Sequence, residues 1–288
     1  MKITDLLATR SPAFSFEFFP PRDEAGLERL FETVADLRVY HPAYVSVTDG
    51  AGGSTRRMTL DLVRRIKSET GIETMAHLTC MGSGRDEVAR ILDQLVQANI
   101  KNVLALRGDP PKAQGQSQPP VDSCAHADEL VAFIRKQHPE LCIGVAGYPE
   151  KHTEAPDFRT DLDHLVSKVQ AGADFIVTQL FFDDRDYFAF ADRLAEANVR
   201  VPVLPGIMPI TNVSQIKRFT AMCGAHIPAR FMARLEAIQD DPDAVRALGV
   251  KHAVGQCQKL LSGHVPGIHF YTLNRSKATV EILRSLIA

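Results

Sequence analysis

The chain has 288 residues, of which 45% are hydrophobic and 24% charged, and its formal net charge is −2. This is the composition of a globular protein with enough apolar residues for a large core. The near-neutral charge argues against broad electrostatic binding to nucleic acid or to an anionic membrane, and we expect neither as a partner.

Short apolar runs alternate with stretches of helical period along the whole chain. Eight runs predict β-strands, at residues 14–19, 44–48, 74–79, 102–106, 142–147, 175–180, 201–207 and 268–272. Helical spacing follows, as at Leu27, Leu30 and Val34, and a last helix carries Leu283 and Leu286. Alternating β and α units favour a parallel sheet. Eight units in this length predict an α/β fold, a single (β/α)8 TIM barrel covering residues 1–288.

The longest spacing lies between the seventh and eighth predicted strands. We expect one or two extra helices in that interval. The alternative fold is an open, doubly wound sheet. It is less favoured because no G-x-G-x-x-G follows the first strand.

The five cysteines are scattered and include no C-x-x-C pair, which argues against a disulfide framework or a zinc knuckle. Neither H-x-H nor H-E-x-x-H occurs, so no metal site is expected. The first residues lack the apolar core of a signal peptide, and no apolar run approaches the ~20 residues of a membrane span. These features predict a cytoplasmic protein.

Glu17 lies inside a run of phenylalanines in the first strand. Strand residues alternate between faces, so Phe14, Phe16 and Phe18 share one side and Glu17 takes the other. If the phenylalanines pack against helices, Glu17 points into the barrel. A buried carboxyl group with a raised pKa suits general-acid chemistry, and the structural alternative is a glutamate paired with a buried base.

Other polar residues lie at the predicted strand ends, where barrels of this type place their active sites. Asp109 has a simple alternative as a turn residue before proline, and His77 as a hydrogen-bonded core histidine. Gln179 has an alternative as an internal hydrogen-bonding partner. Tyr148 with the basic Lys168 could hold a dianionic cofactor, although a solvated loop explains them equally well.

The ordered motifs at these strand ends resemble one family. They are FEFFPP at 16–21, VSVT at 45–48, HLTC at 77–80, LRGD at 106–109, YPE at 148–150, TQ at 178–179, PGI at 205–207 and FYTLNR at 270–275. Together they resemble methylenetetrahydrofolate reductase over essentially the whole chain, in its bacterial form with the catalytic domain alone.

The resemblance implies a barrel that binds FAD noncovalently and is reduced by NADH or NADPH. Methylenetetrahydrofolate then replaces the nicotinamide and accepts hydride, giving 5-methyltetrahydrofolate for methionine synthesis. The flavin supplies the hydride chemistry and the protein supplies position and charge. The resemblance also implies a homo-oligomer.

The resemblance assigns roles residue by residue. Glu17 matches the general acid, and Asp109 the catalytic carboxylate that lies near the flavin and contacts the folate. The implied cofactor contacts are Thr48, His77, Arg107, Gly108, Asp109, Ala127, Tyr148, His152, Asp161 and Lys168. The implied substrate contacts are Asp109, Gln179, Gln215, Phe219 and Arg275.

Some positions depart from the family pattern. Asp49 stands where an aromatic residue is usual, and an acid near the FAD phosphates would weaken binding. His164 and Ser167 stand on the helix of Lys168, where polar or basic cofactor contacts are common. Two alternatives remain: another FAD-dependent barrel such as a proline dehydrogenase-like oxidase, or a partner-dependent subunit that binds flavin or folate without turnover.

Overall fold

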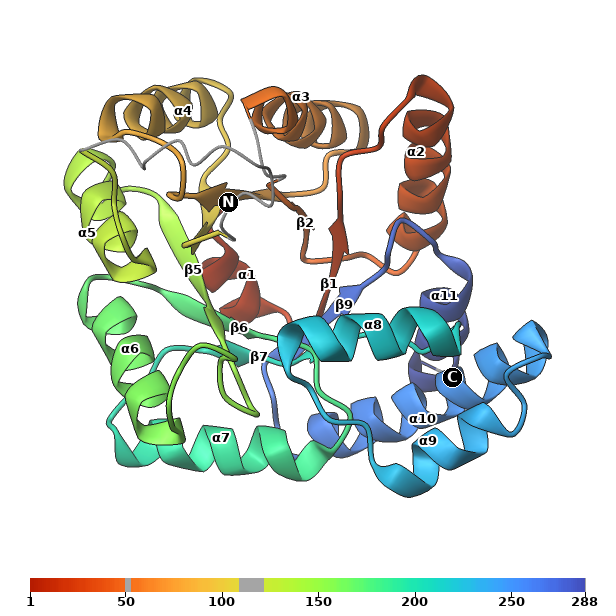
Figure 1. Ribbon diagram of the computed structural model, residues 1–288. Helices are drawn as coiled ribbons and strands as arrows, with labels where there is room; N and C mark the ends of the chain where they lie inside the picture. Colours follow the sequence, from red (N-terminus) through yellow and green to blue (C-terminus); the bar gives the residue numbers. More distant parts are fainter. Residues whose placement is uncertain (50–52, 109–121, 288) are drawn as a thin grey trace, which may run out of the picture.

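The strands form one parallel sheet that curls into a barrel. The computed structural model describes residues 1–49, 53–108 and 122–287. Its strands are β1 (Ala13–Phe18), β2 (Tyr44–Val47), β3 (Thr74–Thr79), β4 (Asn102–Leu106), β5 (Cys142–Gly147), β6 (Phe175–Thr178), β7 (Val203–Leu204), β8 (Gly206–Ile207) and β9 (Gly267–Tyr271). Their order is β7-β6-β5-β4-β3-β2-β1-β9-β8, and every pairing is parallel. The predicted barrel is confirmed (Figure 1).

The seventh predicted strand closes the ring in two short pieces. β7 pairs with β6, and β8 pairs with β9, on either side of Pro205. Proline has no N–H to donate, which interrupts the ladder at this point. The Pro205 carbonyl oxygen still accepts a hydrogen bond from the His269 N–H at 2.9 Å. The nine short strands therefore correspond to the eight predicted ones.

Helices cover the outside of the barrel. They are α2 (Glu24–Arg38), α3 (Gly53–Thr70), α4 (Arg85–Gln97), α5 (Ala127–Gln137), α6 (Phe158–Gln170), α7 (Asp184–Glu196), α8 (Val213–Cys223), α9 (Ala229–Glu236), α10 (Pro242–Ser262) and α11 (Lys277–Ile287). Five of these helices begin at a side chain that accepts a backbone N–H group of the first turn. The capping residues are Asp23 for α2, Asp157 for α6, Asp183 for α7, Asn212 for α8 and Asp241 for α10. Such caps fix where those helices begin.

Three helices lie between β8 and β9. α10 packs against α7 and α11 and so completes the outer ring. α8 and α9 are the additional helices, which confirms the expectation of extra helices in this interval. They pack over a separate apolar cluster that includes Leu180, Phe182 and Ile210.

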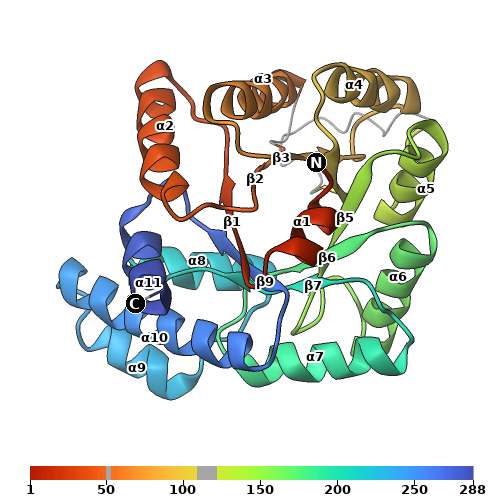
Figure 2. The ribbon, with the colours of Figure 1, turned by 180° about the vertical axis from the view of Figure 1, so that it is seen from behind.

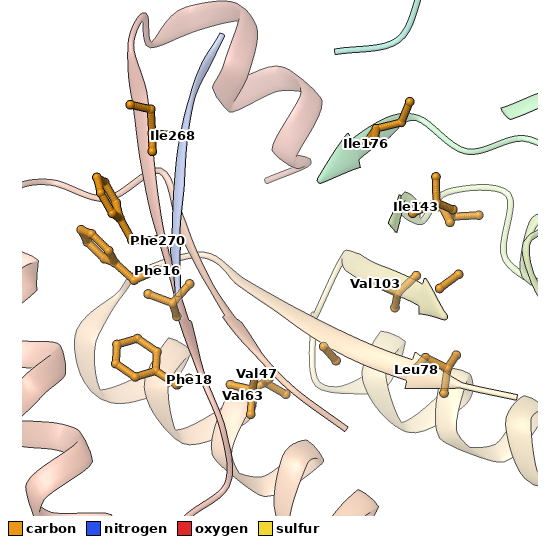
Figure 3. Close-up of a cluster of buried hydrophobic side chains, with 14 of the residues drawn as sticks. Phe16, Phe18, Val47, Val63, Leu78, Val103, Ile143, Ile176, Ile268 and Phe270 are labelled. Carbon is orange, nitrogen blue, oxygen red and sulfur yellow. The ribbon is translucent and has the colours of Figure 1, made fainter. Parts of the chain in front are cut away.

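The main core lies between the sheet and its helices. Phe16 and Phe18 are fully buried in it, and Figure 3 shows them beside Phe270 of the neighbouring strand. The Phe16 and Phe270 rings stack with centroids 6.0 Å apart. The alternation predicted for the first strand is therefore confirmed, since the phenylalanines face the helices.

A short helix, α1 (Ile3–Thr9), was not predicted from the sequence. Its Ile3, Leu6 and Leu7 join the apolar cluster inside the barrel, and the Ile3 N–H donates to Asn102 Oδ1 at 2.8 Å. Figure 2, from behind, shows α1 inside the ring of strands. It packs against residues at the end of the barrel where the strands begin, among them Ala13, Tyr44 and Cys142.

The cysteines and the helix lengths bear on the expected class of protein. All five cysteines are free in the structure. In the described part of the chain, no helix has both the length and the apolarity to cross a bilayer.

Candidate active site

The carboxyl ends of the strands bring most of the predicted site residues to one rim. Thr48 follows β2, His77 lies near the end of β3, Arg107 and Gly108 follow β4, Tyr148 follows β5 and Gln179 follows β6. Parallel strands in a closed barrel end on the same face, so residues far apart in the sequence surround one opening. Asp109 lies outside the described residues.

Glu17 points into the barrel between two histidines. Its Oε2 atom lies 3.3 Å from His77 Nε2 of β3 and 3.4 Å from His269 Nε2 of β9. The Glu17 side chain is only 17% exposed, and His269 is completely buried. Side chains of two other strands, β3 and β9, therefore converge on one carboxylate oxygen of β1.

The expected raised pKa of Glu17 is wrong. Burial alone raises it, but the charges and hydrogen bonds of His77 and His269 act in the opposite direction and together lower the pKa to about 2. Nearby cationic or donating groups favour the charged form of a carboxyl group. Glu17 is thus an anion at neutral pH in this arrangement, and a proton for chemistry has to reach it from its neighbours.

Ser15, Tyr44 and His269 were missed by the sequence analysis. Ser15 Oγ lies 2.8 Å from His269 Nδ1, and the Tyr44 ring stacks on the His269 ring with centroids 5.9 Å apart. Ser15 and His269 are register partners in the β1–β9 ladder. The alternation of faces that directs Glu17 inward also directs His269 inward, between Ile268 and Phe270. The same pattern in the last strand therefore indicates His269 from the sequence.

Basic and aromatic groups line one side of the rim in a connected series. Lys168 Nζ lies 5.9 Å from the centre of the Tyr148 ring, and the Tyr148 and His152 rings meet edge to face at 4.7 Å. His152 Nδ1 accepts the Glu154 N–H at 3.1 Å, and the Glu154 carboxylate binds the Arg107 guanidinium through bonds of 2.6 and 2.8 Å. Two cations thus flank an aromatic pair, a charge pattern that suits a diphosphate group, with the Arg107 guanidinium held by Glu154 in this structure.

Burial shifts the pKa values on this side. It lowers the pKa of Lys168 to about 8, against the opposing effect of Asp161. It also raises the pKa of Asp161, although Lys168 and His152 favour its charged form. Lys168 Nζ donates to the Ala146 carbonyl oxygen at 2.6 Å, which fixes the ammonium group next to the rim.

Asp49 is engaged within the protein. Its Oδ2 atom accepts the Thr79 hydroxyl at 2.6 Å and the Thr79 N–H at 3.2 Å, and it lies 3.5 Å from Arg56 Nε. The Arg56 side chain is 11% exposed and also lies 3.3 Å from a Glu87 oxygen. Because Arg56 offsets its charge, Asp49 is a weaker source of repulsion toward a cofactor than its position in the sequence suggested.

The predicted substrate contacts are spread over three elements. Gln215 and Phe219 lie four residues apart on α8, so they share one face of that helix. Phe219 packs against the cluster beneath α8 and α9. Arg275 is exposed after β9, and its N–H donates to the Thr272 carbonyl oxygen. Ala127 is the first residue of α5.

Comparison with known proteins identifies the family. The family model for methylenetetrahydrofolate reductase matches residues 2–287. The 5,10-methylenetetrahydrofolate reductase of Escherichia coli is 36% identical over 94% of this chain and 90% of its own length. The chain belongs to the methylenetetrahydrofolate reductase family. This membership disfavours the proline dehydrogenase-like alternative.

Longer family members also match. Methylenetetrahydrofolate reductase (NADH) 1 of Arabidopsis thaliana is 39% identical over 99% of this chain but only 50% of its own length. The chain therefore spans about half the length of the plant and yeast reductases that it resembles.

Solved structures agree on the fold of this reductase family member. An uncharacterized protein from Clostridium thermocellum, which binds two copies of 5-methyl-5,6,7,8-tetrahydrofolic acid, superimposes with a TM-score of 0.67 over 100% of both chains at 13% identity. A phosphonopyruvate hydrolase superimposes with a TM-score of 0.54 over 100% of this chain and 86% of its own at 15% identity. At these identities the likeness concerns the barrel alone.

Proposed function

We propose that this protein is an FAD-dependent reductase that converts 5,10-methylenetetrahydrofolate to 5-methyltetrahydrofolate with NADH or NADPH. The proposal rests on family membership together with one observation, the inward Glu17 carboxylate held between His77 and His269 at the open end of the barrel. One barrel domain over residues 1–288 carries the whole site in this proposal. The Arabidopsis relative is named for NADH, which favours NADH as the donor to test first.

The rim fits FAD. Lys168 and Arg107 would bind its diphosphate, and the Tyr148 and His152 rings between them offer an apolar and hydrogen-bonding surface. Thr48, His77, Gly108, Ala127 and Asp161 complete the proposed contacts, with Asp109 as a further one that lies outside the described residues. Bound FAD supplies hydride transfer from nicotinamide to folate.

Glu17 is the proposed general acid. The five-membered ring of the folate must open before its methylene carbon accepts a hydride, and a proton on the departing nitrogen allows that carbon–nitrogen bond to break. Since Glu17 is ionised in this arrangement, the proton has to reach it through the groups beside it, and the Nε2 atoms of His77 and His269 face its Oε2 atom. Ser15, bound to the other nitrogen of His269, holds that ring in place.

The remaining proposed contacts orient the substrates. Gln179 would contact nicotinamide and folate in turn, Phe219 would stack on them, and Gln215 with Asp109 would bind the folate. Arg275 is exposed and would pair with the glutamate tail of the folate. The five free cysteines suit a reducing compartment, so we place this activity in the cytoplasm. A homo-oligomer is proposed from the family resemblance alone.

A spectral titration tests the function. Purified protein is expected to be yellow, to be bleached anaerobically by NADH or NADPH, and to regain its colour when methylenetetrahydrofolate is added. Protein that remains colourless after reconstitution with FAD would contradict the proposal. Flavin-loaded protein that neither nicotinamide reduces would favour the partner-dependent subunit instead.

Replacement of Lys168 with methionine should weaken FAD binding about tenfold or more, because a partly buried cation pairs strongly with phosphate. The exposed Lys251→Met variant is the matched control. Lys168 is charged below a pKa of about 8, so the dissociation constant of the native protein should rise as the pH passes upward through 8. Fluorescence titration of the apoprotein with FAD measures both effects. Equal affinities in the two variants would exclude Lys168 from the site.

A further inference from the structure

A second carboxyl group, Glu150, joins two loops at the rim. Its Oε2 atom accepts the backbone N–H of His226 at 2.8 Å. Glu150 lies in the loop after β5 that also carries Tyr148 and His152, whereas His226 lies just beyond α8. The bond therefore ties the end of α8 to the loop after β5.

A close approach at Gly224 supports the same junction. Gly224 ends α8 in the left-handed conformation, with φ of 77°. A Cβ atom at Gly224 would lie 2.8 Å from Thr153 Cγ2 in the loop after β5. Only glycine allows both this backbone conformation and this contact. Glu150 and Thr153 of the loop after β5 thus lie against His226 and Gly224 beyond α8.

The loop after β5 has braces of its own. Arg193 of α7 donates to the Pro149 carbonyl oxygen at 3.1 Å, and Lys151 Nζ donates to the carbonyl oxygens of His152 and Ala155. The start of α8 is capped by Asn212. Loss of the Glu150 bond should therefore release mainly the far end of α8 and leave the loop in place.

We propose that Glu150 is a positioning residue that holds α8, and with it Gln215 and Phe219, at the distance from the flavin loop that the folate requires. This inference rests on the proposed function, because the roles of Gln215 and Phe219 belong to it. Glu150 acts through the helix and does not itself touch a substrate. It thereby couples the cofactor side of the rim to the substrate side.

The surroundings of Glu150 disfavour its negative charge, although its Oε2 atom accepts a hydrogen bond. Burial raises its pKa to about 7, with smaller contributions from Asp186 and Asp183 at the start of α7, while the His226 N–H acts in the opposite direction. Cys223 also lies close to the Glu150 carboxyl group. The Oε1 atom of Glu150 is buried without a hydrogen-bond partner among the described residues. A glutamine keeps an acceptor oxygen and removes the charge.

This pKa has a consequence for stability. The folded-state pKa lies above the ordinary value of 4.5, so the charge opposes folding. The free-energy cost of this charge is absent below pH 4.5, grows between pH 4.5 and about pH 7, and stays constant at higher pH. Glu150→Gln should therefore raise the melting temperature relative to native protein at pH 8 but not at pH 4.5.

Three variants of the flavin-loaded protein test the positioning role, with 5-methyltetrahydrofolate as the probe in calorimetry. Glu150→Ala should weaken the binding of this probe about tenfold, because it removes the acceptor of the His226 N–H and releases the end of α8. Glu150→Gln should restore binding to within about twofold, and the exposed Glu196→Gln should match native protein. The FAD dissociation constant should change less than about twofold in all three. Hydrogen exchange at residues 213–226 should accelerate only in Glu150→Ala.

The two readouts separate the possible failures. Unchanged exchange in Glu150→Ala would overturn the junction itself. Faster exchange with unchanged 5-methyltetrahydrofolate affinity would overturn the positioning role. Native protein that binds no 5-methyltetrahydrofolate would overturn the proposed function together with this role. The hydrogen-exchange rates at residues 213–226 would still show whether Glu150 ties α8 to the loop after β5.

Discussion

Glu17→Gln is expected to stop folate reduction while leaving flavin reduction nearly intact. Glutamine fills the same space between His77 and His269 but cannot pass a proton. Loss of a general acid typically costs about 10²–10⁴ in rate. Hydride transfer from nicotinamide to flavin needs no such proton, so that half-reaction should change by less than about threefold.

Anaerobic stopped-flow absorbance of the flavin measures the two half-reactions separately. The exposed Glu69→Gln on α3 serves as the control for a lost carboxylate. Native rates in both half-reactions of Glu17→Gln would show that Glu17 is not the acid. Loss of both rates, with FAD still bound, would instead point to a role in orienting the flavin.

Phe16→Ala should lower the free energy of unfolding by about 3–5 kcal/mol, because it removes a fully buried ring from the main core. Phe19→Ala, three positions on, is the matched control, since that ring is 42% exposed and its loss should cost about 0.5 kcal/mol. Urea unfolding followed by circular dichroism compares the two.

This pair also tests how Glu17 is directed. Phe16 faces the helices because Glu17 faces the interior, and the two orientations cannot be separated in a strand. Equal destabilisation by Phe16→Ala and Phe19→Ala would contradict the alternation on which the site depends. An unchanged stability of Phe16→Ala would have the same meaning.

The proposed coupling of Glu150 to α8 complements the proposed proton transfer at Glu17. One carboxyl group lies between two histidines that lower its pKa and hold it ionised, while burial, with a smaller contribution from nearby acidic residues, raises the pKa of the other toward its protonated form. Opposite surroundings thus give two glutamates on the same rim different tasks. In our proposals the first serves proton transfer and the second serves the positioning of α8.

The sequence by itself determined the barrel, the extra helices after the seventh strand and the inward direction of Glu17. Each follows from a local spacing: a period of two in strands, a period near 3.6 in helices, and the alternation of the two. The motifs at the strand ends also determined the family, because they depend on residue identity and order rather than on distance.

Only the tertiary structure decided the charge of Glu17, the position of α1 and the Asp49–Arg56 pair. His269 stands 252 positions from Glu17 along the chain, yet it lies at 3.4 Å and reverses the effect of burial on the carboxyl group. A pKa is a sum over all neighbours in space, and no periodicity along a strand contains that sum. For the same reason the hold of Glu150 on α8 became visible only once the two loops were seen side by side.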